Sequence, residues 1–228
     1  MSKVEYFKWR NDHHVTLRNF IERLVSQISR RNTAYARSYR SKDYPLRYNE
    51  RSMYSLFSSS VSTMTDVMLS ELSVGRRSGG SKAVDDEPAN GRADLWCHLE
   101  GNDVVIELKR VAVGLRNEGQ EDIVMVQNAW RTLCLQLENT RDSLAEWAEG
   151  FQVGLLVVFP WSQDRAYFDK WEKMKVGQFK DRVRANLDPE CKFTAIIPIP
   201  KTHQIIDVGN DRDEFTPFVM IAGIFSKI

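Results

Sequence analysis

Three side chains with complementary chemistry lie between Gly91 and Arg110. Asp94 precedes a Glu-Leu-Lys triplet that runs from Glu107 to Lys109. Two carboxylates with open water positions are donors that suit Mg²⁺ or Mn²⁺. Such an ion orients a phosphodiester and lowers the pKa of an attacking water, and a lysine beside it stabilises developing negative charge. These residue types therefore indicate metal-assisted hydrolysis of a phosphodiester.

This chemistry requires two strands that bring the carboxylates together. Residues 93–99 and 103–109 predict strands, and the Glu-Gly-Asn-Asp sequence between them supplies turn residues. The apolar run of residues 104–106 is typical of a strand that is buried on both faces. Glu107 and Lys109 are two residues apart, so they share a face of the strand. The alternative interpretation is a surface hairpin in which Glu107 and Lys109 form a structural ion pair.

Asp94 in Gly-Arg-Ala-Asp-Leu, followed by Glu107-Leu108-Lys109 at the end of an apolar strand, resembles the PD-(D/E)XK nuclease superfamily. Ala93 stands where that family often has proline. The resemblance implies the restriction-endonuclease-like fold and DNA as the substrate. It also implies that Asp94, Glu107 and the Leu108 carbonyl hold Mg²⁺ or Mn²⁺, and that Lys109 is the catalytic lysine.

Two further residues match family positions on the helices that flank this hairpin. Residues 49–72 predict a helix with Glu50 in its first turn, where the family often carries a glutamate near the metal. The helix dipole equally explains a glutamate there, and Glu71 is a weaker rival. Gln127 shares the buried face of a helix predicted over residues 118–139, where several branches of the family carry an active-site glutamine. Its alternative is a hydrogen-bonded core amide.

The remaining patterns predict a single α/β domain over residues 1–228. Further helices are expected over 12–31, 141–150 and 163–185, and further strands over 152–159, 193–199 and 215–225. Helix, hairpin, helix and central strand is the core order of the resembling fold, here over about 49–160. We therefore expect a restriction-endonuclease-like mixed sheet flanked by helices, with a helical N-terminal addition (1–48) and a C-terminal helix and strands (161–228).

The charges are unevenly distributed, although the net charge is only +1. Residues 1–84 carry a net +8, and the rest of the chain carries −7. A basic N-terminal third could hold DNA through its phosphates, unless these charges only solvate a helical surface. The candidate DNA-contacting side chains are Arg37, Arg40, Arg47, Arg76, Arg77 and Lys82.

The composition limits the classes of site and the cellular settings that fit this protein. The three cysteines are far apart in the sequence, which argues against a zinc site and a disulfide framework and favours a reducing, cytoplasmic setting. No secretory signal is apparent, and no apolar run is long enough to cross a membrane. The apolar strand at 218–225 could pair across a homodimer or lie inside the sheet. We expect a Mg²⁺-dependent deoxyribonuclease. The alternatives are an inactive relative that acts as a nucleic-acid-binding or assembly subunit, and an unrelated α/β protein.

Overall fold

The computed structural model describes residues 5–10, 14–38, 45–48, 50–76, 89–114, 120–163, 176–187, 190–199, 205–207 and 213–228. Seven strands form a mixed sheet in the order β1-β6-β9-β5-β4-β3-β2. They are β1 (Glu5–Trp9), β2 (Met68–Arg76), β3 (Ala89–Leu99), β4 (Asn102–Gly114), β5 (Gly150–Trp161), β6 (Phe193–Pro198) and β9 (Phe218–Lys227). A separate small hairpin consists of β7 (Ile205–Asp207) and β8 (Asp213–Phe215).

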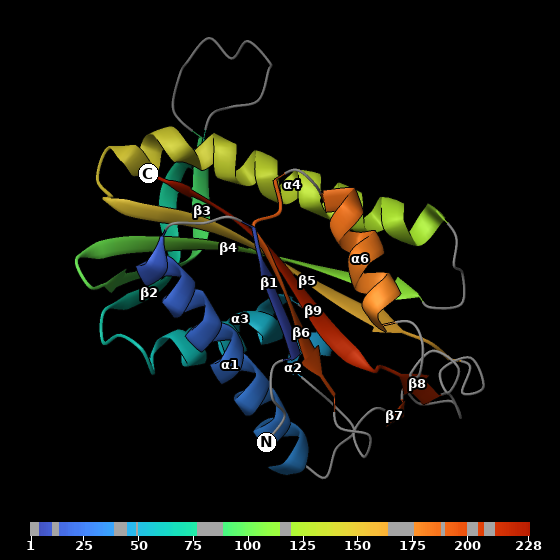
Figure 1. Cartoon of the computed structure of the whole chain (residues 1–228). Helices are drawn as coiled ribbons and strands as arrows, with labels where there is room; N and C mark the ends of the chain where they lie inside the picture. Colours follow the sequence, from blue (N-terminus) through green and yellow to red (C-terminus); the bar gives the residue numbers. More distant parts are fainter. Residues whose placement is uncertain are drawn as a thin grey trace.

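Helices cover both faces of the large sheet (Figure 1). One face packs against α1 (Val15–Ser38), α2 (Pro45–Tyr48) and α3 (Glu50–Val61), and the other against α4 (Gln120–Ala145) and α6 (Val176–Leu187). Strands β4 and β5 are parallel and are joined by α4, whereas the other neighbouring strands of this sheet are antiparallel. The expected mixed sheet flanked by helices is therefore present.

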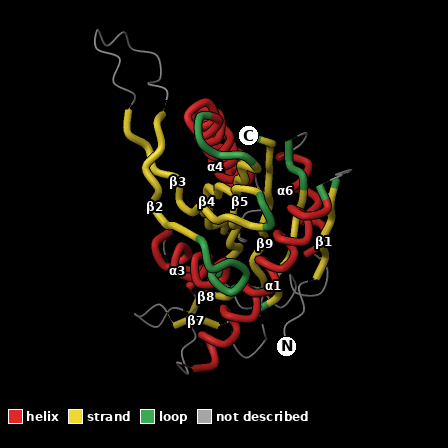
Figure 2. The backbone as a smooth tube through the Cα atoms, turned by 90° about the vertical axis from the view of Figure 1, so that its left-hand side faces the viewer, coloured by secondary structure: helices red, strands yellow, loops and turns green. Residues whose placement is uncertain are grey.

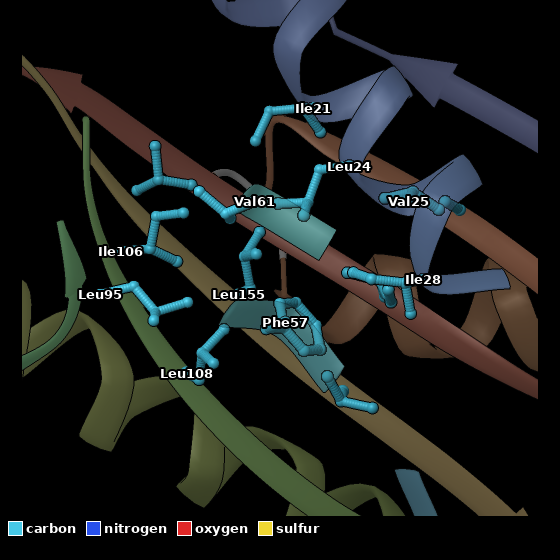
Figure 3. Packing of buried hydrophobic residues seen from close by; sticks show 14 of the residues in the cluster. Ile21, Leu24, Val25, Ile28, Phe57, Val61, Leu95, Ile106, Leu108 and Leu155 are labelled. Carbon is cyan, nitrogen blue, oxygen red and sulfur yellow. The ribbon is translucent and has the colours of Figure 1, made fainter. Parts of the chain in front are cut away.

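The core on the α1–α3 face is closely packed and apolar (Figure 3). Helical spacing places Ile21, Leu24 and Ile28 of α1 on one side of this helix, where they are fully buried. Phe57 of α3 and Ile106 of β4 belong to the same buried cluster. Alternate residues of β4 and β5 therefore point toward α1 and α3, and the residues between them point toward α4.

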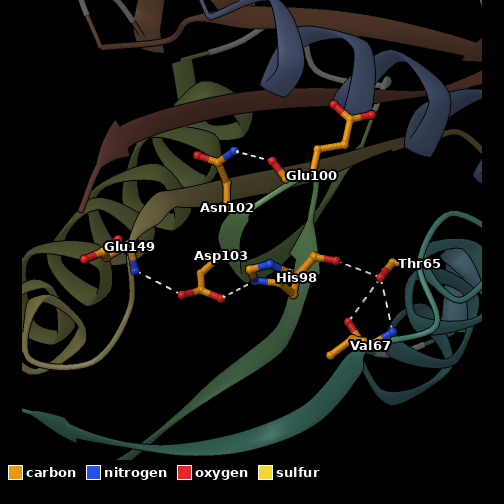
Figure 4. Close-up of polar contacts among 7 residues, drawn as sticks. All are labelled: Thr65, Val67, His98, Glu100, Asn102, Asp103 and Glu149. Atoms are coloured by element: carbon orange, nitrogen blue, oxygen red, sulfur yellow. Dashed lines mark hydrogen bonds and ion pairs between the residues drawn. The ribbon is translucent and has the colours of Figure 1, made fainter.

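The hairpin turn between β3 and β4 has the geometry that the sequence predicts. Glu100 and Gly101 have positive φ values of 50° and 80°, and Leu99 pairs with Asn102 across them. Two consecutive residues with positive φ make a two-residue turn whose twist matches that of the strands. Polar contacts support this end of the hairpin, including one of 3.0 Å between His98 Nδ1 and Asp103 Oδ1 (Figure 4).

The helix expected over residues 49–72 is wrong beyond Val61, because residues 68–76 form β2. The hydroxyls of Ser60 and Thr63 donate to backbone carbonyls within the last turns, at 2.7 Å each, and compete with the helical pattern. Strand β2 then pairs with β3 from Met68↔Cys97 to Arg76↔Ala89. The four-residue spacing of the apolar residues Met68 and Leu72 is compatible with a helix and with a strand. The segment forms a strand because it pairs with β3.

Other boundaries also differ from the prediction. Helix α4 is continuous to Ala145, so the separate helix expected over 141–150 is wrong. Strand β5 continues through Pro160, which pairs with Val113. Strand β9 lies between β5 and β6, so it is unavailable to pair across a dimer. Of the helix expected over 163–185, the described residues show α6 from Val176.

None of the helices within the described ranges combines the length and apolar character needed to cross a membrane.

Candidate active site

Glu107 and Lys109 lie on the face of β4 that is turned toward α4. Their alternating neighbours Val111 and Val113 pack with Trp130 of α4 in one buried cluster. The residue that pairs with Glu107 on the parallel strand β5 is Gly154. Because residues two apart on a strand share a face, Glu107 and Lys109 point the same way, as the sequence predicts.

The Glu107 side chain is almost fully buried, with 2% of its surface exposed. A Cβ at the neighbouring Gly154 would lie 2.7 Å from Leu137 Cδ1 and 3.1 Å from Leu133 Cγ, so α4 approaches the sheet closely here. Burying an ionised carboxylate is costly unless a cation or hydrogen-bond donors compensate it. Glu107 therefore lies in a place where a structural role alone would favour an apolar side chain.

Asp94 is held against the backbone of β4. Its Oδ2 accepts a 2.7 Å hydrogen bond from the N–H of Leu108. The two strands pair from Leu99↔Asn102 to Leu95↔Ile106, and the same register would place Ala93 opposite Leu108. The Asp94 carboxylate thus takes up a donor that the strand ladder would otherwise use. This hydrogen bond holds one carboxylate beside the peptide that follows Glu107.

The Leu108 carbonyl faces the same gap between β3 and β4. In an extended strand the N–H and the C=O of one residue point to the same side. The N–H of Leu108 points to Asp94, so its carbonyl oxygen also opens toward β3. The three residues that the resemblance implies as oxygen donors therefore lie on the paired strands β3 and β4, close to the Asp94–Leu108 hydrogen bond.

Asp94 lies where strand β3 changes the face that it buries. Leu95 and Cys97 belong to the core under α1 and α3, whereas Ala93 packs with Val105 and Leu144 beside α4. A regular strand would keep Ala93 and Leu95 on one face, so β3 twists sharply at Asp94.

The paired strand β2 is irregular at the matching position. Glu71 has a positive φ of 56° and lies between the pairs Ser70↔Leu95 and Leu72↔Ala93. Beyond this point the β2–β3 hairpin extends away from the sheet alongside α4 (Figure 2). The local distortion of both strands accounts for the position of the Asp94 carboxylate between β3 and β4.

Gln127 lies on the side of α4 that faces α6. Its Nε2 donates a 2.9 Å hydrogen bond to Oδ1 of Asn186, so this partly buried side chain connects two helices. Gln136 follows nine residues later, which is half a turn around the helix, so it lies on the side of α4 opposite Gln127. The Oε1 atom of Gln136 is buried and has no hydrogen-bond partner among the described residues.

Gln136 is the polar residue of α4 that the sequence analysis missed. Leu133 and Leu137 approach Gly154, which pairs with Glu107, and Gln136 lies between these leucines along the helix. Gln136 lies within the helix predicted over residues 118–139, so its nine-residue spacing from Gln127 could have identified it as a polar residue on the opposite side.

The two glutamates considered as assisting residues lie on different elements, α3 and β2. Glu50 begins α3, which covers the sheet face opposite α4, and its side chain lies outside the described residues. Glu71 is on β2, where its Oε2 accepts a 3.1 Å hydrogen bond from Arg92 Nη1 in an exposed ion pair.

Most of the predicted DNA-contacting side chains lie outside the described part of the chain. Arg37 is exposed in the last turn of α1. Arg47 and Arg76 have described backbones, in α2 and at the end of β2, but their side chains are not described. Arg40, Arg77 and Lys82 fall within the ranges that the structure does not describe.

The three cysteines are poor nucleophiles. Burial raises the pKa of the Cys97 thiol to about 12, and the negative charge of Asp103 adds to this effect. Burial also raises the pKa of Cys191 to about 11, and burial together with the Glu190 carboxylate raises that of Cys134 to about 12. All three thiols stay protonated near neutral pH, so thiolate catalysis has no support here.

Within the described ranges, no group of three or more His, Cys, Asp or Glu side chains is arranged to hold a metal ion. Comparisons with protein-family models, curated proteins and solved structures find no match to this chain. The residues between Asp94 and Lys109, and their arrangement in the fold, are therefore the features that bear on function.

Proposed function

We propose that this protein is a metal-dependent nuclease that hydrolyses phosphodiester bonds in DNA, with Asp94, Glu107 and Lys109 as its central residues. One observation carries the proposal, namely the 2.7 Å hydrogen bond from the Leu108 N–H to Asp94 Oδ2. It holds an acidic side chain of β3 beside the buried acidic residue of β4. Glu107 and Lys109 share the face of β4 next to α4.

The order of the elements supports the same proposal. Helix α3, hairpin β3–β4, helix α4 and strand β5 follow one another in the chain. This is the order expected of a restriction-endonuclease-like core, and β5 runs parallel to β4 as a crossover through α4 requires. Strand β2 extends the sheet beyond β3, and β9, β6 and β1 extend it beyond β5.

The donor set fits Mg²⁺ or Mn²⁺. Asp94 and Glu107 supply carboxylate oxygens and Leu108 supplies a carbonyl oxygen, and these are the ligands that both ions prefer. When bound, such an ion lowers the pKa of an attacking water and offsets the charge of the phosphodiester. With two carboxylates and one carbonyl from the chain, about half of the positions of an octahedral ion would remain for water and substrate.

The chain itself contributes charge and orientation. Lys109 follows Glu107 on the same face, where its ammonium group can orient a water and stabilise negative charge on the phosphate oxygens. Leu133 and Leu137 close the α4 side with apolar groups, which limits water around Glu107 and strengthens electrostatic interactions there. Asp94 is prevented from turning away by its hydrogen bond to Leu108.

A catalytically inactive DNA-binding protein of the same fold is the second candidate. It is favoured by the observation that the described residues offer two acidic side chains at the site and no group of three metal-ligating ones. A protein of either kind binds DNA, but only the nuclease cuts it and binds Mn²⁺ at Asp94 and Glu107.

Incubation of the purified protein with plasmid, linear and single-stranded DNA tests the proposal, with Mg²⁺, Mn²⁺ or EDTA present. We expect cleavage with either ion, none with EDTA, and loss of cleavage in Glu107→Gln. Glu138→Gln is the matched control, because Glu138 is an exposed glutamate on α4. DNA binding without cleavage under every condition would favour the inactive protein, and absence of both would favour an unrelated α/β protein.

A further inference from the structure

A cavity lies on the sheet face opposite Glu107. It has a volume of about 660 Å³ and opens between α1, α2 and α3. Its lining residues on α1 are Arg31, Ala34, Tyr35 and Ser38. The lining residue on α2 is Pro45, and those on α3 are Ser52, Ser55, Leu56 and Ser59. Cavities of this size are typical of sites for small molecules. No part of the proposed nuclease site contributes to it.

The cavity follows from the sequences of the two helices that face each other. The lining residues of α1 and of α3 each recur with the spacing i, i+3, i+4, i+7, so each set forms one helix face. Earlier along α1, this contact is filled by large side chains such as Leu24 and Ile28, which pack in a cluster with Phe57 and Val61 (Figure 3). At the cavity, alanine and serine replace them. The small side chains of Ala34 and Ser38 on α1, and of the three serines on α3, leave space that is lined in part with hydroxyl groups.

Arg31 places a positive charge in the wall of this cavity. None of the lining residues that the structure describes is acidic. Arginine stays charged at any accessible pH, so this wall remains positive. A phosphate group accepts two parallel hydrogen bonds from a guanidinium, so it is a ligand group that suits this wall.

The other walls favour a ligand that also carries an aromatic, nucleoside-like part. Tyr35 has 39% of its surface exposed at the cavity, and a tyrosine ring is a surface on which a base can stack. Leu56, Ala34 and Pro45 supply apolar contact, and the serines supply groups that can bond a sugar or a phosphate. We propose that the cavity between α1, α2 and α3 binds a nucleoside monophosphate group through Arg31, either as a free nucleotide or as the phosphorylated end of a strand.

Calorimetric titration and thermal shift of the full chain test this proposal with AMP, adenosine, inorganic phosphate and a short oligonucleotide with or without a 5′-phosphate. We expect AMP or the 5′-phosphorylated oligonucleotide to bind at least about tenfold more tightly than its unphosphorylated counterpart. Preference for AMP would identify a free nucleotide, and preference for the phosphorylated oligonucleotide would identify a strand end. Equal binding of phosphorylated and unphosphorylated probes, or no binding of any probe, would overturn the proposal.

Two variants locate the binding. Arg31→Gln removes the charge and should weaken binding at least about tenfold, and Ala34→Leu should do the same by filling the cavity with a good helix former. Arg30→Gln is the matched control, since Arg30 is the exposed neighbour on the same helix. If Arg31→Gln does not fold, Ala34→Leu still decides the question, and wild-type binding by Ala34→Leu would refute the site. These tests use binding without added metal, so their outcome is independent of DNA cleavage.

Discussion

The Asp94 carboxylate accepts a 2.7 Å hydrogen bond from the backbone N–H of Leu108, fourteen residues further along the chain. A side chain here replaces a backbone acceptor in a β-ladder. The interaction has two separable properties, because the hydrogen bond needs only an acceptor oxygen, whereas metal binding needs a negative charge.

Two substitutions at Asp94 separate these properties. Asp94→Asn keeps an acceptor oxygen, so its free energy of unfolding should stay close to that of the wild type, while its Mn²⁺ affinity falls. Asp94→Ala leaves the Leu108 N–H without this acceptor and should lower stability by about 1–3 kcal/mol. Denaturant unfolding and Mn²⁺ titration measure the two effects. Equal Mn²⁺ affinity in Asp94→Asn and wild type would exclude Asp94 as a metal ligand.

Substitution of Lys109 tests the proposed chemistry with little expected effect on the fold. Lys109→Ala should leave thermal stability nearly unchanged, because Val105 and Ile106 hold the strand in the core and Lys109 is only partly buried. Cleavage should fall by about two orders of magnitude or more through loss of one preorganised charge. DNA binding and Mn²⁺ affinity should persist. Lys227→Ala, which removes an exposed lysine at the end of β9, is the control.

Two outcomes for Lys109→Ala would contradict this prediction. Cleavage at the wild-type rate would remove the proposed active site from this part of the sheet. An unfolded variant would favour the structural ion pair between Glu107 and Lys109.

The hairpin was the part of the fold most accessible from the sequence. The turn residues around Gly101 and the apolar run before Glu107 specify a local structure, and the observed pairing of Leu99 with Asn102 confirms it. Strand β2 was missed because the spacing of Met68 and Leu72 satisfies a helix as well as a strand. Only β3, a partner more than twenty residues away, distinguishes the two.

The charged residues of the candidate site could be predicted from the sequence, but the residues of α4 around them could not. The spacing of Glu107 and Lys109 was enough to place them on one face. Which side of α4 faces α6 depends on long-range packing, and this contact is not visible in local periodicity. For this reason Gln127 was chosen and Gln136 was overlooked, although both lie on the same helix.

Salt dependence tests the basic N-terminal third. If Arg37, Arg40 and Arg47 contact phosphates, their combined replacement by alanine should reduce the log–log slope of DNA affinity against salt by about 0.9 for each lost contact. Fluorescence anisotropy over a range of salt concentrations measures this slope. Arg141→Ala is the control, because Arg141 is exposed on α4. An unchanged slope in the triple variant would mean that these arginines only solvate the surface.

Loss of the Cys97 thiol proton should lower the free energy of unfolding at alkaline pH. Its pKa is raised from the ordinary value of 9.0 to about 12, mainly by burial. Between these values the unfolded chain loses the thiol proton and the folded protein keeps it, so the free energy of unfolding falls as pH rises from about 9 to about 12. The loss is at most about 1.4 kcal/mol per pH unit. Cys97→Ala should show a shallower decline in unfolding experiments, and parallel pH profiles would contradict this.

The two-residue turn at Glu100 and Gly101 also bears on the order in which the protein folds. Asp94 and Leu108 are joined through this turn alone, so bringing them together closes a loop of fourteen residues. At the far edge of the sheet, β1 must find β6 across about 190 residues. Short loops close at a smaller entropic cost than long ones, and contacts that are local in sequence form faster. The arrangement of the proposed catalytic residues is therefore available to the chain before its termini join the sheet.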